Sequence, residues 1–186
     1  ERIEAMTLGL PGEHQRTNAA VALRLLEAID DDQTLGLRVG ADAMRAGIAE
    51  VRWPGRLESF TLGGCRVLID AAHNAAGARA LAAYLLATAP SGVTLVFGAM
   101  QDKAVTEMLS ALAPVVVSIV CTTAPNPRAM TADELVLLAS SLGLRAEAIP
   151  DPVSAVGHAC ATGGLVVVAG SIFLIGPVRE WLARDI

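Results

Sequence analysis

The stretch RVLIDAAHNAAGARALAAYLLAT, residues 66–88, decides the fold predicted for this chain. It opens with the apolar run Val67-Leu68-Ile69, which is typical of a strand covered on both faces. The alanine-rich segment 75–88 that follows predicts a helix. A buried strand that passes directly into a helix is the repeating element of a parallel α/β sheet.

The same alternation continues outward from this stretch to the end of the chain. Strands are expected near 66–70, 93–98, 115–121, 144–149 and 164–169, and helices near 75–88, 103–112, 131–142, 152–161 and 177–184. Upstream, residues 57–62 and 66–69 flank Gly63-Gly64, which predicts a β-hairpin. The sequence therefore predicts an α/β fold with a doubly wound, mostly parallel sheet.

The N-terminal quarter has a different pattern. Apolar residues at helical spacing predict a helix over 11–29 and a second, short helix over 38–49. Two helices of this length make a poor independent domain. The WPGR segment at 53–56 predicts a turn and a domain boundary. Residues 1–51 are therefore expected to end a preceding domain, and residues 52–186 to form the α/β domain.

Composition excludes several classes of partner. The net charge of −5 and an aromatic content of 3% argue against a nucleic-acid surface. The longest apolar run, 164–178, is too short for a membrane span. Cys65, Cys121 and Cys160 form no C-x-x-C pair, so zinc ligation is disfavoured and buried or part-buried reduced thiols of a cytoplasmic protein are expected.

The start of the chain also carries an expectation. The first residue is Glu1 rather than Met, and no phosphate loop of the G-x-x-x-x-G-K-[ST] type occurs. The chain is therefore expected to begin in the middle of a larger protein.

Candidate functional residues gather where predicted strands end, which is the ligand-binding edge of such sheets. Asp70 and His73 directly follow the strand of the opening stretch. An aspartate there can accept hydrogen bonds from a ribose hydroxyl pair, and a histidine can donate to a carboxylate or phosphate. Helix capping, with Asn74 as the N-cap, explains this cluster equally well.

Two further candidates lie upstream. Arg56 follows a glycine turn and can bind a phosphate bidentately, although a salt bridge with Glu58 is the simpler interpretation. Asn18, beside His14 and Gln15, carries an amide that can read an adenine edge with a donor and an acceptor. Polar residues on a helix surface are the alternative there.

The remaining candidates follow later strands. Ser171 comes straight after the last predicted strand, where Gly170 permits close approach of a ligand, and capping of a helix is the alternative. Asp102, Lys103 and Arg128 are expected at the same edge, where solvated loop charges are the simpler interpretation.

Taken together, these motifs resemble the folylpolyglutamate synthases, including the bacterial bifunctional dihydrofolate synthase form, a branch of the Mur ligase superfamily. The resemblance lies in His-Gln-x-x-Asn-Ala at 14–19, Trp-Pro-Gly-Arg-Leu-Glu at 53–58, Asp-x-Ala-His-Asn at 70–74 and Gly-Ser at 170–171, with Asp102-Lys103 and Pro127-Arg128 as further matches. Ala71 and Ala75 stand where the family usually has Gly and Pro.

The resemblance implies a Rossmann-like Mur ligase C-terminal domain preceded by the last helices of an ATPase domain. It further implies an ATP-dependent ligase of folate biosynthesis and one-carbon metabolism. ATP would phosphorylate a carboxylate of folate or dihydropteroate, and the amine of L-glutamate would attack the acyl phosphate. The phosphate loop and the Mg²⁺ ligands would lie in the absent N-terminal part, with no metal ligands in this chain. The complete protein is expected to be a cytoplasmic monomer.

The resemblance also assigns roles to individual residues. Asn18 would contact adenine, Arg56 the phosphates and Asp70 the ribose. His73, as the catalytic residue, and Ser171 would bind the incoming glutamate. The chain alone is then expected to be inactive. The alternatives are a Mur-type ligase that extends a cell-wall precursor and a non-catalytic nucleotide-binding domain.

Overall fold

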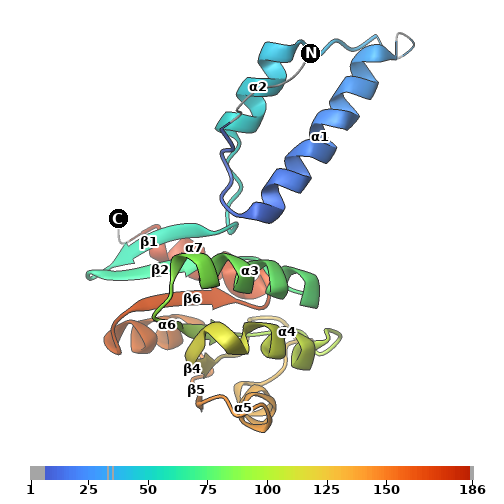
Figure 1. The fold of residues 1–186 in the computed structure, drawn as a ribbon. Helices are drawn as coiled ribbons and strands as arrows, with labels where there is room; N and C mark the ends of the chain where they lie inside the picture. Colours follow the sequence, from blue (N-terminus) through green and yellow to red (C-terminus); the bar gives the residue numbers. More distant parts are fainter. Residues whose placement is uncertain (1–6, 33, 35, 185–186) are drawn as a thin grey trace. The chain divides into compact units, whose positions relative to one another are not determined.

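The computed structural model describes residues 7–32, 34 and 36–184, and the chain divides into two compact units between Pro54 and Gly55 (Figure 1). None of the described helices is both long and apolar enough to cross a bilayer.

The first unit is a pair of helices, α1 (Glu13–Asp31) and α2 (Ala41–Glu50). The Gly9 N–H donates to the Ile48 carbonyl at 3.0 Å, which ties the segment before α1 to α2. Of the α1 side chains only Gln15 is buried, whereas Val21 and Leu25 are 55% and 60% exposed. The two predicted helices are confirmed, and within the described residues they enclose little core of their own.

The second unit is built on one six-stranded sheet with the order β1-β2-β6-β3-β4-β5. The strands are β1 (Glu58–Leu62), β2 (Cys65–Ile69), β3 (Val93–Phe97), β4 (Val116–Cys121), β5 (Ala146–Ala148) and β6 (Leu165–Ala169). The β1–β2 hairpin is antiparallel, and every other neighbouring pair is parallel. The predicted hairpin and mostly parallel sheet are therefore confirmed.

Helices cover both faces of this sheet (Figure 1). They are α3 (Ala75–Thr88), α4 (Val105–Leu112), α5 (Ala132–Ser141), α6 (Pro152–Ala161) and α7 (Ile172–Leu182). Alternate strand residues enter two separate cores: Val167 of β6 packs in the core that includes α3, α4 and α5, and Val166 and Val168 pack in the core with α6 and α7. Strands buried on both faces explain the continuous apolar runs.

The prediction for the last helix is wrong at its start. The sequence predicts this helix near 177–184. The helix instead begins at Ile172 and contains Pro177. Ser171 accepts the Phe173 N–H at 3.1 Å as an N-cap, and this cap starts the helix earlier.

The prediction of three reduced cysteines is also wrong. Cys65 at the start of β2 is disulfide-bonded to Cys160 in α6, although the two residues are 95 apart in sequence. Cys121 is a buried free thiol whose pKa burial raises to about 12. Sequence spacing does not show the pair, because only the packing of α6 on the sheet brings the two segments together.

Glycine is required where β6 leaves the sheet. Gly170 has a φ of 111°, and a Cβ there would lie 2.6 Å from the Gly98 carbonyl oxygen and 2.7 Å from the ring of Phe97. Gly164 also has a positive φ, of 85°, but a Cβ there would meet nothing within 4 Å. Substitution of both glycines by alanine therefore distinguishes two costs. Both variants have an unfavourable φ, and only the one at Gly170 adds steric overlap.

We predict that Gly170→Ala lowers the free energy of unfolding by about 3 kcal/mol or more, because overlap adds to an unfavourable φ. The matched Gly164→Ala change should cost only about 1 kcal/mol. Urea denaturation of both variants measures the difference. Equal losses would show that the close approach at Gly170 is absent.

Candidate functional site

Two sequence motifs meet at the carboxyl edge of the sheet. The Gly55 carbonyl accepts the Ala71 N–H at 2.7 Å, and the Leu57 N–H donates to Asp70 Oδ2 at 3.0 Å. Gly55 is buried with a φ of 72°, and a Cβ there would lie 2.9 Å from Ile175 Cγ2. The turn that carries Arg56 is thus fixed to the strand-to-helix junction at residues 70–74.

Asp70 is the centre of this arrangement. Its side chain is only 6% exposed, and its Oδ1 accepts the Ala72 N–H at 2.9 Å while its Oδ2 accepts that of Leu57. Leu57 has a φ of 47°, a left-handed conformation that costs a bulky residue on the order of 1–3 kcal/mol. The carboxylate therefore stabilises a strained turn, and it acts on Arg56 through the backbone.

The Glu58 carboxylate holds the same turn through a second set of contacts. Its carboxylate accepts the Gly55 N–H at 2.7 Å and binds the Arg179 guanidinium bidentately at 2.8–3.1 Å. Burial raises the pKa of Glu58, but the hydrogen bonds and charge of Arg179, with the Gly55 N–H, hold that pKa below its ordinary value of 4.5.

The salt bridge considered for Arg56 with Glu58 is wrong, because Arg179 of α7 occupies that position. Arg56 is half-buried, and the described part of the chain offers its guanidinium no ion pair. A guanidinium on a rigid turn at the ligand-binding edge is suited to bidentate binding of a phosphate.

His73 lies on the other side of the junction and has a defined tautomer. Its Nδ1 is 2.8 Å from the Ala71 carbonyl oxygen, and since a carbonyl only accepts, Nδ1 carries the hydrogen. Nε2 is then the nitrogen that a ligand can use, as an acceptor when the ring is neutral and as a donor when it is protonated.

The capping alternatives hold for two of the candidates. Asn74 Oδ1 accepts the Gly77 N–H at 2.8 Å, and Ser171 caps α7 as described above. Ser171 is 2% exposed, yet it adjoins the site because the neighbouring Gly170 N–H donates to the Ala72 carbonyl at 3.0 Å. Capping does not test a ligand role for Ser171, which stays a prediction.

Two cations extend the site toward β3 and β4. Asp102 Oδ2 is 2.8 Å from Lys103 Nζ, and Asp102 Oδ1 is 4.0 Å from Arg128 Nη1. The Gln101 N–H donates to the Arg128 carbonyl at 2.9 Å, so the loops after these two strands are joined. Parallel strands end at one edge, which places this group at the same edge as Arg56 with an excess of positive charge.

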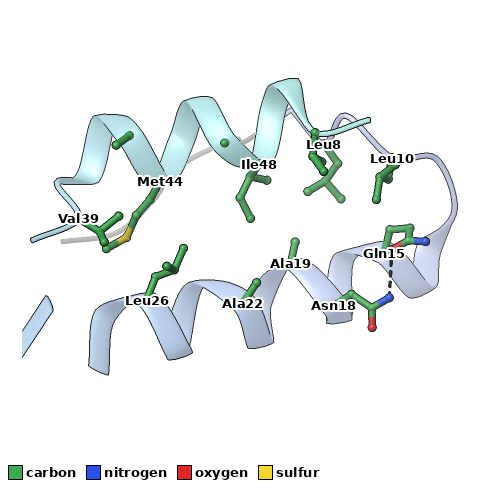
Figure 2. A pocket seen from close by; sticks show the side chains of 13 residues that line it. Leu8, Leu10, Gln15, Asn18, Ala19, Ala22, Leu26, Val39, Met44 and Ile48 are labelled. Carbon is green, nitrogen blue, oxygen red and sulfur yellow. Dashed lines mark hydrogen bonds between the residues drawn. The ribbon is translucent and has the colours of Figure 1, made fainter. Parts of the chain in front are cut away.

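Asn18 belongs to the first unit. It borders a cavity of about 380 Å³ between α1 and α2, with Ala22, Leu26, Met44 and Ile48 among its largely apolar lining (Figure 2). Asn18 Nδ2 donates to Gln15 Oε1 at 3.0 Å, which leaves the exposed amide its second N–H hydrogen and its Oδ1 for a ligand. The structure thus brings together Arg56, Asp70, His73 and Ser171 in the second unit, and Asn18 lies outside that group.

Over the described residues, no three His, Cys, Asp or Glu side chains converge in a way that could hold a metal ion.

Comparison with known proteins identifies the class of this fold and site. Residues 55–172 match the family described as Mur ligase, glutamate ligase domain. The dihydrofolate synthase/folylpolyglutamate synthase of Mycobacterium tuberculosis is 36% identical over 199 residues, which cover 96% of this chain and 40% of that protein.

Solved structures agree with this match. Mycobacterium tuberculosis folylpolyglutamate synthase complexed with ADP has a TM-score of 0.82 at 35% identity, over 96% of this chain and 42% of that one. E. coli FolC in complex with DHPP and ADP has a TM-score of 0.80 at 28% identity, over 98% and 42%. The chain belongs to the Mur ligase family. The dihydrofolate synthase/folylpolyglutamate synthases of Mycobacterium tuberculosis and Bacillus subtilis are among the relatives that it matches, and it spans 40% and 41% of their length.

The Glu58→Gln variant tests the contacts of Glu58 with Arg179 and with the Gly55 N–H. Because the folded-state pKa of Glu58 is depressed, its stabilisation is present above the unfolded pKa near 4.5 and is lost as pH falls through the folded value. The pair is partly exposed, so the variant should lose about 1 kcal/mol of unfolding free energy at pH 7. This loss should shrink as the pH is lowered below 4.5.

Urea denaturation between pH 3 and 7 (roughly spanning both carboxyl states) measures this effect. Glu180→Gln is the matched control, since Glu180 pairs with Arg184 on the exposed side of α7. That change should cost less than about 0.5 kcal/mol. A pH-independent loss in Glu58→Gln would contradict the assignment.

Proposed function

We propose that this chain is the C-terminal portion of an ATP-dependent ligase that adds L-glutamate to folate, and also to dihydropteroate, through an acyl phosphate. One observation carries the proposal: the Asp70 carboxylate fixes the turn of Arg56 against the junction that bears His73. The similarity to an ADP-complexed folylpolyglutamate synthase supports a nucleotide as the ligand of this edge.

The nucleotide is assigned to residues of both units. Arg56 binds the phosphates, where its charge offsets the negative charge that develops as the phosphoryl group is transferred. Asp70 holds the Leu57 turn and so serves the nucleotide chiefly by positioning Arg56 beside the phosphates. Asn18, with a free donor and acceptor on its amide, reads the adenine edge.

The amino-acid substrate is assigned to the other side of the junction. His73 has its hydrogen on Nδ1, so Nε2 of the neutral ring is the atom that can accept a proton from the attacking amine of L-glutamate. Ser171 contributes its hydroxyl beside the junction. L-Glutamate carries two carboxylates, and the cations of Lys103 and Arg128 complement that charge.

The reaction sequence follows from these positions. ATP supplies the phosphoryl group to the folate or dihydropteroate carboxylate, and the amine then forms the amide bond as inorganic phosphate leaves. Bringing an amine to an acyl phosphate depends mainly on orientation and on exclusion of water. Mg²⁺ is assigned to the preceding domain.

Arg56→Ala in the complete enzyme, with its preceding domain, tests the proposal. Loss of the bidentate phosphate contact should raise the KM for ATP on the order of tenfold or more, while KM for L-glutamate changes little. The assay is ATP-dependent addition of radiolabelled L-glutamate to dihydropteroate and to a reduced folate.

Arg145→Ala is the matched control, since this exposed arginine precedes β5 at the opposite edge of the sheet. It should leave both KM values unchanged. An unchanged KM for ATP in Arg56→Ala would remove Arg56 from the site, and absence of glutamate addition by the unmodified enzyme would remove the proposed reaction.

A further inference from the structure

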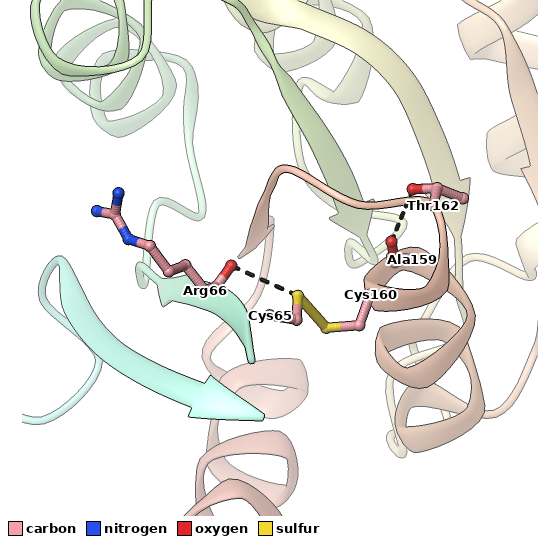
Figure 3. The surroundings of a disulfide bond; sticks show 5 residues. All are labelled: Cys65, Arg66, Ala159, Cys160 and Thr162. Carbon is pink, nitrogen blue, oxygen red and sulfur yellow. Dashed lines mark hydrogen bonds between the residues drawn. A yellow bond between two sulfur atoms is a disulfide. The ribbon is translucent and has the colours of Figure 1, made fainter. Parts of the chain in front are cut away.

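The disulfide lies at the amino edge of the sheet, away from the candidate site. Cys65 is the first residue of β2, and Cys160 lies in the last turn of α6 (Figure 3). Their Cα atoms are 5.5 Å apart, a separation at which a disulfide forms without backbone movement. Both side chains are only partly buried, so solvent and small molecules reach this pair.

The bond joins the two segments that lead to the candidate site. β2 (Cys65–Ile69) leads from Cys65 to Asp70, which follows the strand, and the chain after Cys160 enters β6 (Leu165–Ala169), which is followed by Gly170 and Ser171. β2 and β6 are hydrogen-bonded neighbours over four residue pairs, from Arg66–Leu165 to Ile69–Val168. The disulfide therefore closes the start of the strand pair whose far end carries the site.

The sulfur atoms themselves are far from the site. Asp70 lies five residue steps beyond Cys65 along β2, which corresponds to roughly 16 Å at about 3.3 Å per residue. Neither sulfur can reach a substrate bound at the carboxyl edge. The oxidation state of this pair must therefore act on the stability of the fold and leave the chemistry of the site unchanged.

A hydrogen-bond acceptor for a reduced Cys65 thiol is already in place. Cys65 Sγ is 3.7 Å from the Arg66 carbonyl oxygen, an acceptor that a thiol can use and a disulfide cannot (Figure 3). Both cysteines pack against the core beneath α6 and α7. Cys121, with its pKa raised to about 12, supplies almost no thiolate at neutral pH and does not compete for exchange.

We propose that Cys65 and Cys160 are a reversible thiol–disulfide exchange site for low-molecular-weight disulfides. One cysteine thiolate attacks a sulfur of the small disulfide, which releases one small thiolate and leaves a mixed disulfide on the protein. The second cysteine thiolate attacks the protein sulfur of that mixed disulfide and releases the second small thiolate. The protein loses two electrons, the small disulfide gains them, and the two cysteine protons pass to the two released thiolates.

Oxidation stabilises the fold by restricting the unfolded chain. The closed loop spans 95 residues of sequence and contains β3, β4 and β5, so the unfolded state loses much conformational freedom. Reduction should therefore lower the melting temperature of the chain by on the order of 10 °C. Reoxidation should restore it.

The 186-residue chain is equilibrated with glutathione disulfide or with excess reduced glutathione. The protein is then denatured, its free thiols are alkylated, and mass spectrometry counts the alkylated thiols. One alkylated thiol, that of Cys121, is expected after oxidation and three after reduction. Thermal denaturation of the same samples measures the shift.

Cysteine variants distinguish the effect of the disulfide on the melting temperature from the effect of side-chain packing. Cys65→Ser and Cys160→Ser should each melt at a temperature that reductant does not change, whereas Cys121→Ala should retain the reductant-dependent shift. Three alkylated thiols after oxidation, persistent glutathione adducts on the pair, or a reductant-independent melting temperature in the unmodified chain would each overturn the proposal.

Discussion

The hydrogen bonds that the buried Asp70 carboxylate accepts from Leu57 and Ala72 are the constraint on which the candidate site depends. They join a turn at the start of the second unit to the end of β2. Without an acceptor at this point, two buried backbone N–H groups would lose a partner, at a cost of about 1–3 kcal/mol each. Leu57 would also lose the bond that holds its left-handed conformation. The site is therefore assembled by a side chain that folding itself requires.

The parallel sheet determines where the Asp70 hydrogen bonds lie relative to the other candidate residues. Because β2, β6, β3 and β4 run parallel, their carboxyl ends deliver the Asp70 junction, Ser171, Lys103 and Arg128 to one edge. Close approach at Gly170 brings β6 against β3, and the Glu58–Arg179 pair anchors the Arg56 turn to α7. These four parts of the site thus lie on connections between strands and helices, whose rigid ends hold the polar side chains in place.

The local pattern was sufficient to predict the sheet, the hairpin and most helices, because buried strands and amphipathic helices leave periodic signals. What the sequence did not reveal depends on pairs that are distant along the chain. Glu58 pairs with Arg179 and Cys65 with Cys160, and neither partner is marked by spacing. The capping alternative weighed for Ser171 marks the start of α7, whereas the helix was predicted near 177–184. Ligand contacts of Asp70 and Ser171 stay predictions, whereas the structural hydrogen bonds of both residues are seen only once the chain is packed.

A double-mutant cycle on the complete enzyme tests the central claim, that Asp70 serves the nucleotide chiefly by positioning Arg56. The KM for ATP is measured for Asp70→Asn, Arg56→Ala and the double variant. If Asp70 acts through the turn, the double variant should match Arg56→Ala alone, with a KM raised roughly tenfold. Independent effects that multiply toward roughly a hundredfold would contradict the account and assign Asp70 a separate contact with the nucleotide.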